Sequence, residues 1–460
     1  MLLSEAAGYM DGEFLCDEEA WVPSVGTDTR NITKGELFFA LKGENFDGNK
    51  YAEEALKQGA CAVVISDKKC QARPAILVKD TLLALGSLAK SWRDRFTLPV
   101  IAITGSNGKT TVKEMLTSIL NAASNKPNAV LATAGNLNNH IGMPMTLLKI
   151  RKQHAFAVIE MGMNHLGEID YLTRIAQPTV AVINNAGTAH IGELGSRDNI
   201  AKAKGEIYAG LSDDGIAVIN ADDDYAAYWK SLNLGKKIIT FGLNKTADMS
   251  ATFTEKDDLT EVHLTTPNGG VSFDLALLGK HNISNALAAS AAAVALGISN
   301  KDIARGLGNM QAVYGRLQRK AGFNDAELID DTYNANPDSM KAAIDVLATQ
   351  KTSTIFVMGD MAELGENAPQ MHADIGLYAK QKGIEQFFAF GALSAKASLA
   401  FGDNAQHFGS IESLVSALKV QMKQGVTVLV KGSRFMQMER VVKQLLTSEL
   451  LEEKQDREKI

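Results

Sequence analysis

Short apolar runs alternate with stretches of helical periodicity along most of the chain. After residue 109, for example, Val112, Met115, Leu116, Ile119 and Leu120 recur three and four positions apart, on one face of a helix. The apolar runs have the length of buried strands and lie at 37–41, 62–65, 98–103, 156–159, 180–183, 216–219, 326–329, 354–358, 387–390 and 426–430. Strands that alternate with helices predict an α/β fold with largely parallel sheets.

The length of 460 residues is too great for one hydrophobic core and indicates about three domains. We expect a small α/β domain over residues 1–96, with a helix at 51–59 between two of its strands. A central domain over 97–313 is expected to hold a mostly parallel sheet of the P-loop ATPase type, with a further helix at 283–296. The pattern over 314–460 predicts a doubly wound, Rossmann-like domain.

Composition narrows the class of protein. A formal net charge of −6 argues against a general nucleic-acid or membrane-surface binder. No Lys or Arg precedes Arg30, so the basic region of a signal peptide is missing, and the longest apolar stretch, 286–297, is too short to span a bilayer. The three cysteines lack metal-type spacing. We therefore expect a soluble cytoplasmic protein without a membrane span and without a nucleic-acid partner.

The most informative stretch is Thr104-Gly105-Ser106-Asn107-Gly108-Lys109-Thr110-Thr111. It lies between an apolar strand and an amphipathic helix, which is the layout of a phosphate-binding loop. Backbone N–H groups and the helix N-terminus face the anion, Lys109 adds a charge, and the Thr110 hydroxyl can reach Mg²⁺. The commonest form of this loop requires Gly at position 103, where this chain has Ile103, so the loop is of a shorter type.

Polar residues follow the ends of two further strands, where ligands gather in parallel sheets. Glu160 comes directly after the run at 156–159, and its carboxylate suits Mg²⁺. His190 follows the run at 180–183, although a lone His is usually structural. Lys202 and Lys204 lie in a segment that is typical of a helix start, and without further context they indicate a solvated basic face.

Together these motifs resemble the Mur ligases, the ATP-dependent amide-forming enzymes of peptidoglycan precursor synthesis, over essentially the whole chain. The specific segments are 104–111, Glu160, the region of His190 and Lys204, 281–285, 315–316 and 330–337. Segments 160–169, 330–337 and 431–434 are most similar to members that add D-alanyl-D-alanine to UDP-N-acetylmuramoyl-tripeptide. The D-N-P-R motif typical of the diaminopimelate-adding relative is not found in the last domain.

The resemblance implies roles for individual residues in the central site. Those implied to bind ATP are Gly105, Ser106, Asn107, Gly108, Lys109, Thr110, Thr111, Asn282, Asn285, Arg316 and Asp331. Asn285 corresponds to the adenine-side contact, and Arg316 and Asp331 bring the last domain onto the nucleotide. The implied catalytic group is Lys109, Glu160, His190 and Lys204. The implied ligands of two Mg²⁺ ions are Thr110, Glu160, His190 and a carbamylated Lys204.

The resemblance also implies substrate sites. Residues implied to bind the UDP-substrate are Thr29, Arg30, Asn45, Phe46, Asp47, Thr133, Asn136, Asn138 and Asn139. Taken alone, Asp28, Arg30 and Asp47 are typical of turns and helix caps. Two departures affect this site, since Thr29 replaces the usual Ser, and Asn49 stands where the family has His. By their position, Asn334, Asn336 and Arg434 are candidate dipeptide contacts.

Two other functions use the same phosphate loop. A non-catalytic nucleotide switch has no need for Glu160, His190 and Lys204 to converge. A sister enzyme, such as another Mur ligase or a folylpolyglutamate synthase, shares the chemistry but takes other substrates. The sequence leaves open whether the third peptide residue is diaminopimelate or lysine. We expect a monomer in which the last domain closes on the nucleotide about a hinge near residues 312–316.

Overall fold

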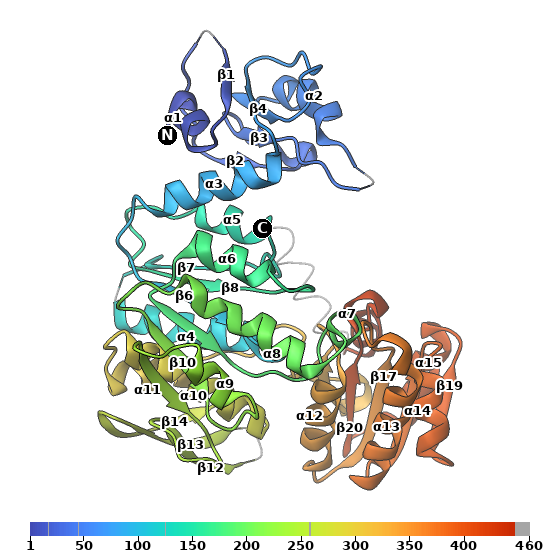
Figure 1. Cartoon of the computed structure of the whole chain (residues 1–460). Helices are drawn as coiled ribbons and strands as arrows, with labels where there is room; N and C mark the ends of the chain where they lie inside the picture. Colours follow the sequence, from blue (N-terminus) through green and yellow to red (C-terminus); the bar gives the residue numbers. More distant parts are fainter. Residues whose placement is uncertain (17, 45, 125, 257–258, 447–460) are drawn as a thin grey trace.

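The structure, a computed structural model, describes residues 1–16, 18–44, 46–124, 126–256 and 259–446. It has the three-domain α/β architecture that the hydrophobic pattern predicts (Figure 1). The first and central domains are stacked, and the last domain lies beside the lower part of the central one in this view. The exact boundaries proposed above, at 96/97 and 313/314, stay predictions.

The first domain contains a five-stranded sheet in the order β1-β5-β4-β3-β2. Only β1 runs antiparallel to its neighbour. Its strands are β1 (Glu13–Leu15), β2 (Val25–Gly26), β3 (Leu37–Phe39), β4 (Ala62–Ile65) and β5 (Ala75–Leu77). Its helices are α1 (Leu3–Tyr9), α2 (Ala52–Lys57) and α3 (Thr81–Arg93).

The central domain is built on a six-stranded parallel sheet in the order β11-β10-β9-β6-β8-β7. Its strands are β6 (Val100–Thr104), β7 (Val130–Ala132), β8 (Phe156–Glu160), β9 (Val180–Ile183), β10 (Ile216–Asn220) and β11 (Lys237–Phe241). Its helices are α4 (Lys109–Ser124), α5 (Gly142–Leu147), α6 (Glu168–Ala176), α7 (Ile191–Leu194), α8 (Arg197–Gly205), α9 (Ala226–Ser231), α10 (Lys280–Ala295) and α11 (Asn300–Gly308). Because all strands are parallel, their carboxyl ends share one edge.

A second, antiparallel sheet of three strands belongs to the same domain and was not expected from the sequence. It consists of β12 (Ser250–Glu255), β13 (Thr260–Thr266) and β14 (Gly269–Leu275). Burial alternates strictly along β13, as it does in a sheet with one face on the core. Its apolar face packs with α10 and α11.

The last domain has a six-stranded sheet in the order β15-β16-β20-β17-β18-β19, parallel except for β15. The strands are β15 (Gln318–Ala321), β16 (Glu327–Asp331), β17 (Ser353–Gly359), β18 (Gln386–Phe390), β19 (Ala405–Phe408) and β20 (Val426–Lys431). The helices are α12 (Pro337–Ala348), α13 (Ala368–Gln381), α14 (Ser394–Phe401), α15 (Ile411–Gln421) and α16 (Glu439–Leu445). This is the doubly wound pattern expected from the sequence.

One sequence prediction about local structure is wrong. Lys202 and Lys204 lie in the last turn of α8, not at the start of a helix. The helix begins after Ser196, whose side chain accepts a hydrogen bond from the Asn199 N–H and caps it. Lys204 is buried while Lys202 is exposed, so the pair does not form one solvated basic face.

The structure also shows the state of the cysteines and the character of the helices. Cys16, Cys61 and Cys70 are free thiols. None of the helices in the described ranges combines the length and the apolar character that crossing a membrane requires.

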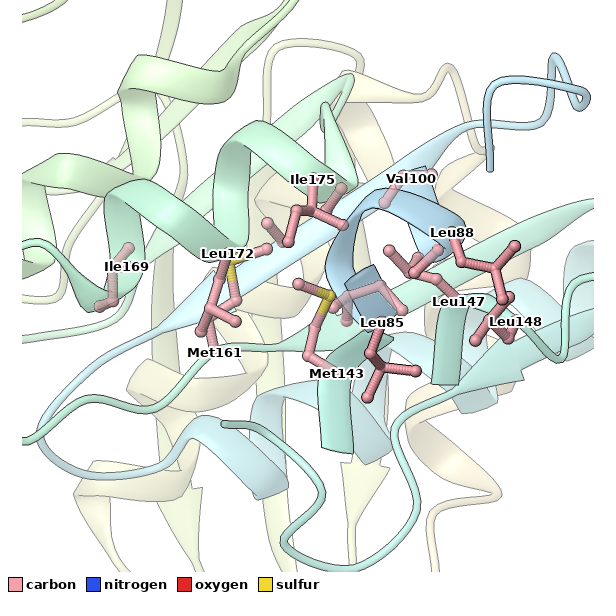
Figure 2. Packing of buried hydrophobic residues seen from close by; sticks show 14 of the residues in the cluster. Leu85, Leu88, Val100, Met143, Leu147, Leu148, Met161, Ile169, Leu172 and Ile175 are labelled. Atoms are coloured by element: carbon pink, nitrogen blue, oxygen red, sulfur yellow. The ribbon is translucent and has the colours of Figure 1, made fainter. Parts of the chain in front are cut away.

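The first and central domains share a continuous apolar core (Figure 2). Leu85 and Leu88 of α3 lie among side chains of α5 and α6, including Leu147 and Leu172. All four are essentially excluded from water. Burial of this kind contributes about 1.5–3 kcal/mol for each such side chain, so the first domain is fixed against the central sheet by packing.

Replacing Leu85 by Ala removes buried methyl groups from this shared core and should lower the free energy of unfolding by about 2–5 kcal/mol. Urea denaturation followed by circular dichroism measures the loss. The matched control is Leu83→Ala on the same helix, because the Leu83 side chain is 57% exposed. Equal midpoints for the two variants would contradict a packed joint between these domains.

Candidate active site

A cleft of about 1210 Å³ lies at the carboxyl edge of the central sheet and is lined by both the central and the last domain. Most of the central-site residues predicted from the sequence line it. They are Ser106, Asn107, Gly108, Lys109, Thr110, Thr111, Asn136, Asn138, Asn139, Glu160, His190, Asn282, Asn285, Arg316, Asp331, Asn334, Asn336 and Arg434. Gly105, Thr133 and Lys204 do not line it but neighbour residues that do. The cleft therefore joins segments from two domains at one surface.

The phosphate loop connects β6 to α4 and is held by two amides that follow β9. The Asn107 N–H donates to Asn185 Oδ1 at 2.8 Å, and Asn184 Nδ2 donates to the Asn107 carbonyl at 2.9 Å. Lys109 Nζ donates to the Gly105 carbonyl at 2.7 Å and so lies folded over the loop. These bonds fix the loop between two neighbouring strands before any ligand binds.

Gly108 is required by both its backbone and its surroundings. Its φ is +79°, in the left-handed region that favours glycine. A Cβ at this position would lie 2.2 Å from Asn285 Oδ1 and 2.5 Å from Asn184 Nδ2. The loop therefore closes directly onto the start of α10.

Glu160 ends β8 with its carboxylate set beside the phosphate loop. The Thr110 hydroxyl donates to Glu160 Oε2 at 3.0 Å, and Asn138 Nδ2 donates to Oε1 at 2.7 Å. Thr133 Oγ1 accepts the Glu160 N–H, which aligns the end of the strand. A buried carboxylate next to the hydroxyl of a phosphate loop is an oxygen donor set suited to Mg²⁺.

The last domain reaches this loop through polar contacts. Arg316 donates from its terminal NH2 group to Thr110 Oγ1 at 3.0 Å, and Asn336 Nδ2 donates to Asn107 Oδ1 at 2.7 Å. Ser106 Oγ and Arg316 Nε are buried and have no hydrogen-bond partner among the described residues. Buried polar groups without partners are costly, and both residues line the cleft, where a ligand could satisfy them.

His190 directly precedes α7, and Lys204 lies in the last turn of α8. His190 Nδ1 is 2.7 Å from Oε2 of Glu363, a residue of the last domain. Lys204 is 2% exposed, and burial lowers its pKa well below the usual range, with a further contribution from the Lys109 ammonium. Within the described ranges, no three His, Cys, Asp or Glu side chains form a cluster able to hold a metal by themselves.

Other predicted residues lie in the cleft with partners of their own. Asn285 accepts from Asn184 Nδ2 and donates to Asn282 Oδ1. Asp331 forms a buried ion pair with Lys431 at 2.6 Å. The Asn139 side chain accepts N–H bonds at the start of α5. These residues therefore make contacts within the protein itself. Their roles in binding ATP and substrate stay predictions.

The candidate dipeptide residues come from two segments of the last domain, the loop between β16 and α12 and the turn after β20. Asn336 caps α12 and also contacts the phosphate loop. Asn334 Oδ1 accepts from the backbone N–H groups of Ala335 and Arg434. The Arg434 side chain is 60% exposed and pairs with Glu439. All three lie beside the cleft, where a second substrate can reach them.

The first-domain residues Thr29, Arg30, Phe46 and Asp47 do not line this cleft, and Asn45 lies outside the described residues. Asp28 caps a short helix at Thr29–Asn31, and its hydrogen bonds from Arg30 hold its pKa at about 2. Asp47 likewise caps the helix that begins at Gly48. Asp28 and Asp47 thus act as helix caps in this structure, as expected for such residues taken alone. The role of this region in binding the UDP-substrate stays a prediction.

The departure at Asn49 has a structural account. Asn49 is buried, its side-chain amide donates to Asp47, and its carbonyl oxygen accepts the N–H groups of Ser66 and Asp67. The residue therefore joins this turn to the end of β4.

Three residues with clear positions in the site were not predicted. Asn184 and Asn185 directly follow β9, so the rule that ligands gather at strand ends would have found them. Glu363 follows β17 by only four positions, but its contact with His190 joins two domains and has no local signal in the sequence.

The geometry defines a class, an enzyme that binds a nucleotide on a phosphate loop and covers it with a last domain. Family models match along the chain in the same order: "Mur ligase family, catalytic domain" over 22–93, "Mur ligase middle domain" over 103–293 and "Mur ligase, glutamate ligase domain" over 315–434. The chain belongs to the Mur ligase family.

Individual relatives narrow the comparison. The UDP-N-acetylmuramoyl-tripeptide--D-alanyl-D-alanine ligase of Escherichia coli K12 is 42% identical over 96% of this chain and 98% of its own length. A crystal structure of MurF from Acinetobacter baumannii matches with a TM-score of 0.89 at 38% identity, over 96% of this chain and 97% of that one. MurF ligase from Thermotoga maritima in complex with ADP matches with a TM-score of 0.82 at 28% identity, over 92% and 96%.

Gly108→Ala should weaken nucleotide binding by about tenfold or more, which corresponds to a loss of about 1.4 kcal/mol. The new methyl group meets Asn285 and Asn184, and the left-handed backbone is unfavourable for Ala. Isothermal titration with ADP and Mg²⁺ measures the change. Gly409→Ala is the control, because a Cβ there has no neighbour within 4 Å. Unchanged ADP affinity in Gly108→Ala would remove this loop from the nucleotide site.

Proposed function

We propose that this chain is an ATP-dependent amide ligase that joins D-alanyl-D-alanine to UDP-N-acetylmuramoyl-tripeptide in peptidoglycan precursor synthesis. The observation that carries the proposal is the contact between the Thr110 hydroxyl and the Glu160 carboxylate beside the phosphate loop, in a chain that belongs to this ligase family. The relative named for this reaction aligns over nearly its full length, which supports the choice of substrates.

The chemistry explains why a phosphate loop serves an amide-forming enzyme. A carboxylate does not react with an amine at neutral pH because its oxygen is a poor leaving group. Transfer of the γ-phosphoryl group of ATP to the carboxylate gives ADP and an acyl phosphate. The amine then attacks the acyl carbon, inorganic phosphate leaves, and the amine proton passes to solvent or a base. Charge develops on phosphoryl oxygens, so positioning and electrostatic stabilisation dominate.

The residues around the loop suit this task. The loop N–H groups and Lys109 would bind the phosphates, while Thr110 and Glu160 would hold one Mg²⁺. Burial favours the neutral amine of Lys204, the form that reacts with carbon dioxide to give a carbamate. A carbamate attracts a cation where an ammonium repels it. Lys204 and His190 would then hold a second Mg²⁺, which supplies charge neutralisation when it is bound.

The substrates approach from opposite sides in this proposal. The UDP-tripeptide is bound by the first domain and by the loop at 133–139, and the dipeptide by Asn334, Asn336 and Arg434. Polar contacts between the central and last domains favour a joint that opens and closes about residues 312–316. We propose a monomer that works in the cytoplasm.

The alternatives use the same loop differently. A nucleotide switch has no use for a carboxylate acceptor, and a sister ligase would accept a different amine or a different acid. The wide coverage and identity of the relative named for D-alanyl-D-alanine addition favour the main proposal.

Substrate-dependent ADP release tests the function directly. With ATP, Mg²⁺ and UDP-N-acetylmuramoyl-tripeptide, we expect ADP to form rapidly only when D-alanyl-D-alanine is added. A coupled assay with pyruvate kinase and lactate dehydrogenase measures it, and parallel runs with the diaminopimelate and lysine tripeptides determine the third residue. Release that does not depend on the dipeptide would refute the proposal.

Lys204→Ala should reduce kcat by about a thousandfold if the carbamate places a metal ion, since electrostatic stabilisation of this kind contributes several kcal/mol. Added acetate or formate should restore part of the rate by replacing the missing carboxylate. Lys202→Ala, on the same helix but exposed, is the control and should retain full activity. Full activity in Lys204→Ala would exclude Lys204 from the mechanism.

A further inference from the structure

The contact between His190 and Glu363 joins the central and last domains at the edge of the cleft. The Nδ1 atom of His190 lies 2.7 Å from Oε2 of Glu363, and both residues line the cleft. The Glu363 side chain is 47% exposed and that of His190 is 22% exposed, so the pair borders the space in which a ligand binds. Neither the motifs in the sequence nor the family resemblance assigned a role to Glu363.

The backbone around this pair is arranged to hold the carboxylate in place. The Gly192 N–H donates to the Glu363 carbonyl at 2.9 Å, directly across the two domains. A Cβ on Gly192 would lie 2.7 Å from the Gly365 nitrogen and 2.8 Å from the Glu363 carbonyl oxygen. The close approach of the two loops thus depends on glycine at 192.

Both members of the pair have an uncommon backbone conformation. His190 has a φ of +64° and Glu363 a φ of +62°, in the left-handed region that non-glycine residues rarely adopt. Such conformations cost about 1–3 kcal/mol each and persist where the surrounding structure enforces them, often at functional sites. Here two of them face each other and direct two side chains together.

We propose that Glu363 is a positioning residue that completes the metal site from the last domain. In the structure the two groups are in contact without an aligned hydrogen bond, and His190 Nδ1 has no hydrogen-bond partner among the described residues. With nucleotide bound, a turn of the ring would let the carboxylate accept the Nδ1 proton, which leaves the lone pair of Nε2 free to bind a divalent cation. Metal-binding histidines commonly donate their second ring N–H to such a carboxylate, which fixes the tautomer and raises the basicity of the ligand. The inference rests on the proposed role of His190 as a metal ligand.

This arrangement couples domain closure to metal binding. The central domain supplies Glu160 and His190, but the group that orients His190 arrives only with the last domain. When the last domain moves away, the imidazole loses its acceptor and can adopt either tautomer. Closure therefore completes the cation site before the γ-phosphoryl group is transferred, in the same movement that brings the last domain over the nucleotide.

The tautomer of His190 can be measured without any metal. In nitrogen-15 spectra of the metal-free protein with ADP bound, so that the last domain is closed, and assigned by comparison with His190→Gln, we expect the proton of neutral His190 on Nδ1. In Glu363→Ala, the spectrum should move toward the mixture of tautomers seen in a free imidazole. A wild-type His190 with its proton on Nε2 would overturn the proposal, whether or not the enzyme proves to be a ligase.

Metal affinity supplies the second test. Mn²⁺ binding in the presence of ADP, followed by electron paramagnetic resonance, should weaken by about 10–100-fold in Glu363→Ala. Glu363→Gln keeps the shape and an acceptor oxygen but not the charge, and it should fall between Glu363→Ala and the wild type. Glu366→Gln, on the same loop but outside the cleft lining, is the matched control and should bind Mn²⁺ normally.

In turnover assays the same series should lower kcat and raise the Mg²⁺ requirement, with little change in the KM for ATP. A residue that only held the two domains together would leave Mn²⁺ affinity at the central domain unchanged. Mn²⁺ affinity within twofold of the wild type in Glu363→Ala would therefore overturn the proposal. Dipeptide-independent ADP release would refute the ligase assignment but would leave the tautomer and Mn²⁺ results to be judged separately.

Discussion

The hydroxyl of Thr110 is the point at which the parts of this enzyme meet. It donates to the Glu160 carboxylate on β8 and accepts from the Arg316 guanidinium of the last domain, each at 3.0 Å. One small group at the start of α4 thus links the phosphate loop, the neighbouring strand and the covering domain. The arrangement is possible because β6 and β8 are adjacent and parallel, so that the loop and Glu160 emerge at the same edge.

The two joints between domains differ in chemistry, and the difference suits the proposed reaction. The first domain is attached through a dry core of Leu and Met side chains, which favours one fixed position (Figure 2). The last domain touches the phosphate loop through the Asn336 amide and the Arg316 guanidinium, and it touches His190 through the Glu363 carboxylate. Water can replace all three of these polar contacts. In the proposed reaction the acyl phosphate must form before the amine attacks it. A fixed domain for one substrate and a movable domain for the other suit that order.

Much of the fold and part of the site follow from local sequence patterns. The apolar runs at 156–159 and 180–183 became β8 and β9, and the motif at 104–111 is the loop between β6 and α4. The prediction that Lys202 and Lys204 lie at the start of a helix is wrong. The helix begins earlier, where the Ser196 side chain caps it. The antiparallel sheet of β12–β14 was missed because its strands are half-exposed and carry no continuous apolar run. Glu363 could not be found, since its partner lies on another domain and only the tertiary fold brings the two together.

The central claim is that the phosphate loop activates a substrate carboxylate as an acyl phosphate. Oxygen-18 in the terminal carboxylate of UDP-N-acetylmuramoyl-tripeptide tests it most directly, with mass spectrometry of the phosphate released in the presence of ATP and D-alanyl-D-alanine. We expect each phosphate to carry one labelled oxygen, because the carboxylate oxygen leaves with the phosphoryl group when the amine attacks. Unlabelled phosphate, formed at the same rate as the amide, would contradict activation through an acyl phosphate.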